Sequence, residues 1–102
     1  MPDKKEEFLK QIKKKYDDLN YQWNIERNKI EAKLQHQGAD ATKIFEEKRE
    51  ELRKFRSEMK EKIVDLEVAG ENAWEEVKEG AEDAWKVLSN AFDKATGHFK
   101  KK

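Results

Sequence analysis

Apolar side chains recur every three or four residues along most of the chain and are separated by charged positions. In the first third they form a narrow stripe, interrupted once, by Glu26. This stripe consists of Leu9, Ile12, Tyr16, Leu19, Trp23, Ile30 and Leu34. The spacing follows a heptad and predicts a helix over about residues 3–36, and a stripe this narrow is typical of a coiled-coil seam.

A second heptad pattern begins near Ala41, after a turn predicted at 37–40. Its apolar positions are Phe45, Leu52, Phe55, Met59, Ile63 and Leu66. In the connecting segment HQGAD, we expect Gly38 to take the left-handed conformation that ends a helix and Asp40 to cap the next one.

Folding the chain back at Gly38 places residue i opposite a residue near 77 − i. Trp23 then pairs with Phe55, and Leu19 pairs with Met59. The same register pairs Tyr16 with Ile63, and Ile12 with Leu66. One fold-back therefore aligns most of both stripes, which predicts an antiparallel helical hairpin. We predict this hairpin seam from Ile12, Tyr16, Leu19, Trp23, Leu52, Phe55, Met59, Ile63 and Leu66.

Beyond Leu66 the period changes to eleven residues. Ala73, Trp74 and Val77 return as Ala84, Trp85 and Leu88, and the pattern continues to Phe92 and Phe99. Eleven residues in three turns keep an apolar stripe almost straight along a helix. We predict a second seam, for an oligomer or a partner helix, from Ala73, Trp74, Val77, Ala81, Ala84, Trp85, Leu88 and Phe92; its alanines allow close approach of the partner.

Two arrangements compete for covering this second seam, because the first helix is already used on residues 41 to about 70. The second helix either continues unbroken over 41–97 and pairs with another subunit, or breaks at 70–72 and folds back as the third helix of a bundle. In the broken form Gly70 ends the helix, while Asn72 and Glu75 form a capping box. The apolar pattern passes through Gly70 without a phase slip, which favours the continuous helix. We therefore expect one all-α domain over residues 1–102, a hairpin with a long second helix that forms an oligomer.

Composition narrows the class of protein. Charged residues make up 45% of the 102 residues and hydrophobic residues 35%, which suits helical seams better than a thick globular core. The 23 basic and 23 acidic side chains balance, so the chain lacks the net positive field of a nucleic-acid binder. There is no cysteine, and neither a signal peptide nor a membrane span is evident, so we expect a cytoplasmic protein.

The residues with chemical potential do not form a pattern typical of catalysis. His36 and His98 lack a metal-ligand partner at a useful spacing. Glu71, Glu75 and Glu79 lie one turn apart on a helix, whereas hard cations prefer ligands that converge from a loop. We therefore predict no enzyme activity, no catalytic residue, no cofactor and no metal site.

Four segments resemble a small bacterial coiled-coil family whose members are described as stress-response proteins in cyanobacteria and other bacteria. Leu19 to Asn24 resembles its Leu-x-x-Trp-Asn element with a different spacing, and 50–53 matches EELR. Gly70 to Trp85 matches its G-x-x-AWEE repeat, and 91–95 matches AF-x-KA. The resemblance implies a helical, non-enzymatic protein linked to stress, and it implies no ligand or catalytic residue.

Two functions follow as expectations. The first is a self-associating scaffold or protective protein whose partner is itself or another helical protein. The alternative is a peripheral membrane protein, because eleven-residue amphipathic repeats also lie flat on lipid. Against lipid, residues 67–97 carry 8 acidic and 3 basic side chains.

Overall fold

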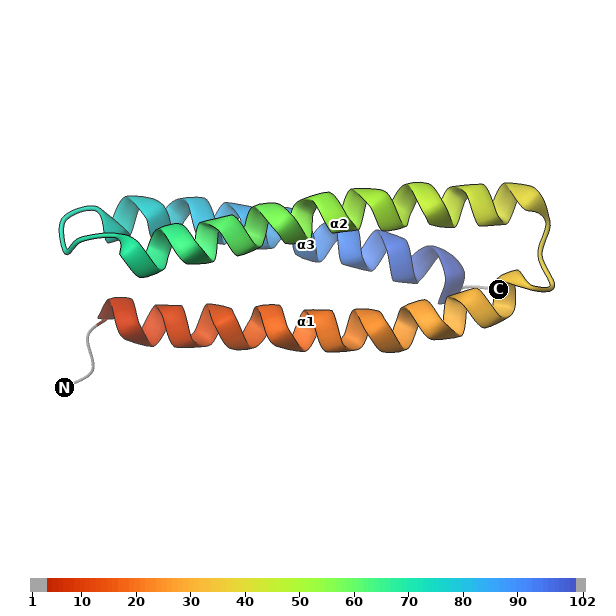
Figure 1. Ribbon diagram of the computed structural model, residues 1–102, viewed down its shortest axis with the longest axis horizontal. Helices are drawn as coiled ribbons and strands as arrows, with labels where there is room; N and C mark the ends of the chain where they lie inside the picture. Colours follow the sequence, from red (N-terminus) through yellow and green to blue (C-terminus); the bar gives the residue numbers. More distant parts are fainter. Residues whose placement is uncertain (1–3, 101–102) are drawn as a thin grey trace.

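The computed structural model describes the backbone of residues 4–100 and the side chains of 4–97. This part of the chain is helical and contains no strand. Helix α1 spans Lys4–Leu34, α2 spans Ala39–Val68 and α3 spans Trp74–Lys100. The helices lie side by side, with α2 antiparallel to both α1 and α3, in a rod measuring 53 × 21 × 18 Å (Figure 1).

The turn between α1 and α2 differs from the prediction in its conformation. Gly38 precedes α2 with φ −77° and ψ 172°, and no described residue has a positive φ. The chain leaves α1 through short-range bonds instead: the amides of His36 and Gln37 donate to the Lys33 and Leu34 carbonyls. Asp40 does not precede α2 as a cap but lies in its first turn, where its charge complements the helix dipole.

The hairpin register is also shifted from the predicted one. Both helix ends at this turn, Leu34 and Ala39, lie two residues nearer the N-terminus than predicted, so the pairing moves by about one helical turn. Trp23 stacks on Phe45, at a ring-centroid distance of 6.2 Å, ten residues before the Phe55 that the predicted register placed opposite it.

The long second helix over 41–97 is not present in this structure. Helix α2 ends at Val68, Ala69 is extended with φ −68° and ψ 137°, and α3 begins at Trp74. The Gly70 carbonyl accepts hydrogen bonds from the Ala73 and Trp74 amides at the start of α3. Gly70 therefore accepts the first bonds of this helix, a role that we predicted for Asn72 as its N-cap. The break costs a few helical hydrogen bonds, which water can replace, and it buries the apolar stripe of α3 within the same chain.

The core runs the length of the rod, with residues from all three helices. Its buried apolar residues are Ile12, Leu19, Trp23, Ile30, Phe45, Leu52, Met59, Ile63, Leu66, Ala81, Leu88, Ala91 and Ala95. Helix α1 contacts both α2 and α3, and α2 also packs on α3, so each seam is covered by two helices; the expectation that α1 is used up on α2 alone was wrong.

Candidate functional site

The eleven-residue seam of α3 faces the interior of the same chain. Ala81 and Leu88 are fully buried, and five further seam residues are partly buried against the core: Trp74, Val77, Ala84, Trp85 and Phe92. Ala73 is exposed and lies in the 69–73 connection. Phe99 lies outside the described side chains.

The residues of the predicted hairpin seam also lie in this core. Seven of them are buried, namely Ile12, Leu19, Trp23, Leu52, Met59, Ile63 and Leu66, while Tyr16 and Phe55 are partly buried. The Tyr16 hydroxyl donates to the Arg56 carbonyl oxygen at 3.1 Å, which connects α1 to the backbone of α2.

Helices α2 and α3 approach each other more closely than α1 approaches either. Small residues on α3 explain this, because Ala81, Ala91 and Ala95 are buried. A helix presenting alanine allows a neighbouring backbone to come near. The α2–α3 pair is therefore the closely packed part of the molecule.

Helix α1 contacts α3 mainly through long side chains, with residues about 70 positions apart in the sequence lying side by side. The Lys78 ammonium lies 5.3 Å from the ring centroid of Phe8 and 5.8 Å from that of Trp74. Farther along, Trp23 meets Phe92 with ring centroids 6.5 Å apart. Large side chains keep the two backbones apart.

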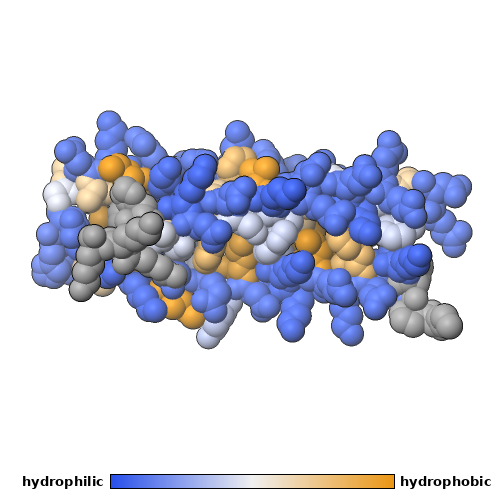
Figure 2. All heavy atoms as spheres, turned by 180° about the vertical axis from the view of Figure 1, so that it is seen from behind, coloured by the Kyte–Doolittle hydropathy of each residue, from blue (hydrophilic) through white to orange (hydrophobic). Residues whose placement is uncertain are grey.

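Two open hollows of about 510 and 330 Å³ lie along the line between α1 and α3. Lys15, Trp85 and Ser89 border both of them. Together they form a shallow furrow, which we call the α1–α3 furrow. Its apolar floor is bordered by Asp18, Glu82, Asp83, Lys86 and Asp93. On the face drawn in Figure 2, apolar atoms reach the surface in separate patches between charged side chains.

A polar layer interrupts the core where the sequence has its one polar position in the first stripe. Glu26 is 9% exposed and Thr96 is 3% exposed, and the spacing of about 70 residues places them at the same level of α1 and α3. The Thr96 hydroxyl donates to the Phe92 carbonyl oxygen at 2.9 Å, so it is satisfied within its own helix.

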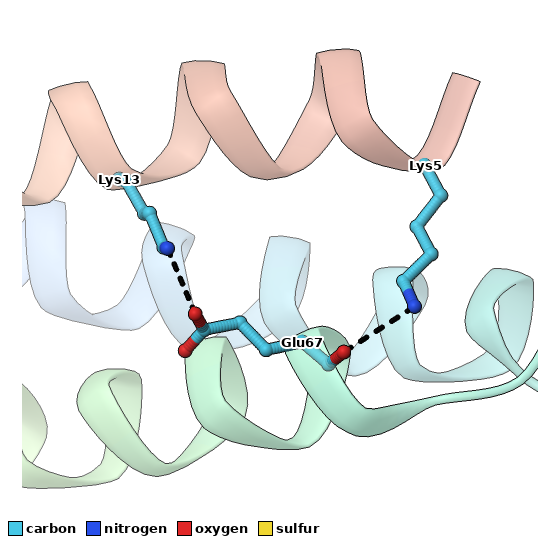
Figure 3. Close-up of polar contacts among 3 residues, drawn as sticks. All are labelled: Lys5, Lys13 and Glu67. Atoms are coloured by element: carbon cyan, nitrogen blue, oxygen red, sulfur yellow. Dashed lines mark hydrogen bonds and ion pairs between the residues drawn. The ribbon is translucent and has the colours of Figure 1, made fainter. Parts of the chain in front are cut away.

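Three residues connect α1 to the end of α2, and we call them the hinge clamp: Lys5, Lys13 and Glu67 (Figure 3). The Lys13 ammonium lies 2.8 Å from the Glu67 carboxylate. The Lys5 ammonium donates to the main-chain carbonyls of Glu67 and Ala69. These carbonyls end α2, whose last turn contains no basic residue of its own, so Lys5 supplies the positive charge that a helix C-terminus favours.

Sequence reasoning missed the hinge clamp. Lys5 and Lys13 are two of 23 basic residues, and no local pattern distinguishes them from the others. Glu67 comes near both lysines only because the C-terminal end of α2 packs beside the first turns of α1.

Within the described residues, no three His, Asp or Glu side chains lie close enough together to bind a metal ion. His98 lies outside the described side chains. None of the helices, as far as they are described, is long and apolar enough to cross a membrane.

No protein-family model matches the chain, and comparisons with curated proteins and with solved structures gave no significant match.

Proposed function

We propose that this protein is a non-enzymatic helical scaffold that works by helix association, with a second copy of itself as the first partner. The closed three-helix bundle of a single chain is its resting form. In this form the apolar stripe of α3 is kept from water, and the chain is ready to exchange contacts between helices for contacts with a partner.

The uneven packing of the three helices carries this proposal. The α2–α3 seam is close and rich in small residues, whereas α1 rests on it through long side chains and leaves the α1–α3 furrow beside it. Surface charge and the half-exposed ion pair of Lys13 and Glu67 contribute little to holding a helix. Helix α1 is itself anchored by buried apolar residues, so the α1–α3 furrow beside it, and not its removal, is what the closed bundle offers to another amphipathic helix.

The resemblance of the AW repeat to a bacterial stress-response family supports a protective role. We propose that the protein acts under stress, when a scaffold that binds itself or other exposed helices is useful. The resemblance suggests the condition under which the protein acts, namely stress, and it adds no site residue.

Sedimentation velocity of the wild-type protein over a wide micromolar concentration range tests the proposal. We expect a reversible, concentration-dependent rise from the mass of one chain towards that of two. A single species with the mass of one chain at every concentration would rule out self-association. The closed bundle would then be the only form.

Lipid binding is the second candidate, favoured by the position of Trp74 and Trp85 at the partly exposed edge of the most amphipathic helix. Opening of the bundle would let both indoles enter the headgroup region. The 8 acidic side chains against 3 basic ones in residues 67–97 oppose binding to anionic lipid.

Tryptophan fluorescence decides between the two candidates in a Trp23→Phe variant, which leaves only Trp74 and Trp85 to report. As a scaffold, the protein keeps the same emission wavelength when anionic vesicles are added. A shift of the emission to the blue on adding vesicles would favour the membrane instead.

A further inference from the structure

The connection between α2 and α3 departs from helical geometry over only a few residues. Ala69 is extended, Glu71 to Ala73 form a turn, and no residue of the connection has a positive φ. A Cβ added at Gly70 would have no neighbour within 4 Å. The segment 69–73, which we call the hinge segment, therefore has no conformation that only glycine can adopt, and no tight packing prevents it from becoming helical.

The apolar pattern continues across the hinge segment in helical phase. Met59, Ile63 and Leu66 are buried at the end of α2. Intervals of three or four residues then lead through Gly70, Ala73 and Trp74 to Val77 and Ala81. If the hinge segment were helical, α2 and α3 would form one helix with all these residues on one face.

The pairing of α2 with α3 is symmetric about the hinge segment. Lys62 faces Gly80, a pair centred on residue 71, and both line a small hollow together with Asp65, Glu76 and Val77. Two straight helices crossing antiparallel at residue 71 would bring Lys62 of one copy opposite Gly80 of the other, about a two-fold axis, as in the α2–α3 pair of the closed form.

The hinge clamp favours the closed form. In a straight helix the carbonyls of Glu67 and Ala69 accept bonds from the amides four residues later, at Glu71 and Ala73. In the closed form these carbonyls accept from Lys5 instead. Lys5 therefore stabilises the closed hinge through contacts that a straight helix does not need.

We propose that the partner of this chain is a second copy that exchanges α3: the hinge segment straightens, and each α3 packs on the α2 of the other copy. The contacts are those of the closed bundle, formed between chains, and the small residues Ala69, Gly70 and Ala73 meet at the two-fold axis. This inference rests on the proposed self-association and specifies its route.

Two substitutions at one position test the exchange in opposite directions. Gly70→Ala fits the closed hinge and favours the straight helix by about 1 kcal/mol in each of two chains. Sedimentation equilibrium should therefore give a dimer about 30-fold tighter than the wild type, since 1.4 kcal/mol corresponds to tenfold. Gly70→Pro breaks a straight helix, whereas in the closed hinge Ala69 already has the extended conformation that precedes a proline. It should abolish the dimer.

A cross-link shows whether α3 has been exchanged. The chain has no cysteine, so a Lys62→Cys, Gly80→Cys pair can be joined with a short bis-maleimide and separated on a denaturing gel. The closed form gives links within one chain, whereas the exchanged dimer gives links between two chains. With the Gly70→Ala change added, we expect the second product to dominate at high concentration.

Lys5→Gln supplies an independent arm, with Lys10→Gln as the matched control on the exposed face of α1. Lys5→Gln should raise the dimer fraction, and Lys10→Gln should leave it unchanged. A dimer with links only within one chain overturns the exchange and leaves self-association intact. Strictly monomeric wild-type and Gly70→Ala proteins overturn both.

Discussion

The indole of Trp23 meets the ring of Phe92 edge to face, with an interplanar angle of 71° and ring centroids 6.5 Å apart. The same indole stacks on Phe45 at 6.2 Å, so one residue of α1 contacts rings on both other helices. Edge-to-face and offset-stacked rings add to the stabilisation that burial of their area provides. This three-ring cluster connects α1 to both helices of the α2–α3 pair.

Replacing Trp23 with alanine should therefore be highly destabilising. Trp23 is only 2% exposed, and removing a buried tryptophan typically costs about 3–5 kcal/mol. Urea unfolding followed by circular dichroism measures the loss. Tyr21→Ala is the control: Tyr21 is on the same helix but 65% exposed, and its change should stay within about 0.5 kcal/mol. Equal losses in the two variants would contradict the position of α1.

The hydroxyl of Tyr16 should contribute a measurable part of the α1–α2 contact. Tyr16→Phe removes its hydrogen bond to the Arg56 carbonyl and should lower the free energy of unfolding by about 1 kcal/mol. Tyr21→Phe, at an exposed position, should have no effect. No difference between the two variants would mean that the hydroxyl bonds to water instead.

The Lys13–Glu67 ion pair should contribute little to stability. Both side chains are nearly half exposed, at 46% and 40%, so a double-mutant cycle with Lys13→Gln and Glu67→Gln should give at most about 1 kcal/mol. The coupling energy should fall as sodium chloride is added, because salt screens exposed charges. A coupling that is large and independent of salt would contradict this exposure.

Gly80→Ala should stabilise the protein. Gly80 lies inside α3, where glycine costs up to about 1 kcal/mol relative to alanine, and the new Cβ would make an ordinary contact with Lys62. Thermal unfolding measures the gain. A loss of stability would show that the new Cβ has less room than its 3.9 Å distance to Cδ of Lys62 indicates.

Ala81→Leu tests the close α2–α3 seam from the opposite side. Ala81 is fully buried, so a larger side chain must displace its neighbours, at a cost of about 1–3 kcal/mol. The matched control is Ala32→Leu, at an exposed position of α1, which should be nearly neutral. If both substitutions were tolerated equally, the seam would not be closely packed at Ala81.

Local periodicity was enough to find most residues of the core, although the predicted seams did not include Ala91 and Ala95. Leu52, Met59 and Leu66 follow a heptad, Trp74 and Trp85 follow an eleven-residue repeat, and all of them lie in or against the core. Helical geometry alone decides which residues share a stripe. It does so whichever helix packs against that stripe.

The direction of the chain after Leu66 could not be derived in the same way. The stripe is in phase through Gly70 whether the helix continues or folds back, so the pattern of residues is the same for both forms. The hinge clamp could not be predicted from the sequence either, because Lys5 binds the Glu67 and Ala69 carbonyls only after the chain has folded.

By itself, then, the sequence determined three amphipathic segments and the face that each one buries, because side-chain spacing along a helix is a local property. Only the tertiary structure decided that Trp23 lies against Phe45 and Phe92, that α1 lies against both α2 and α3, and that α2 ends at Val68. These outcomes depend on contacts between residues far apart in the chain. There, a small difference in free energy between burying α3 within one chain and burying it elsewhere selects the fold.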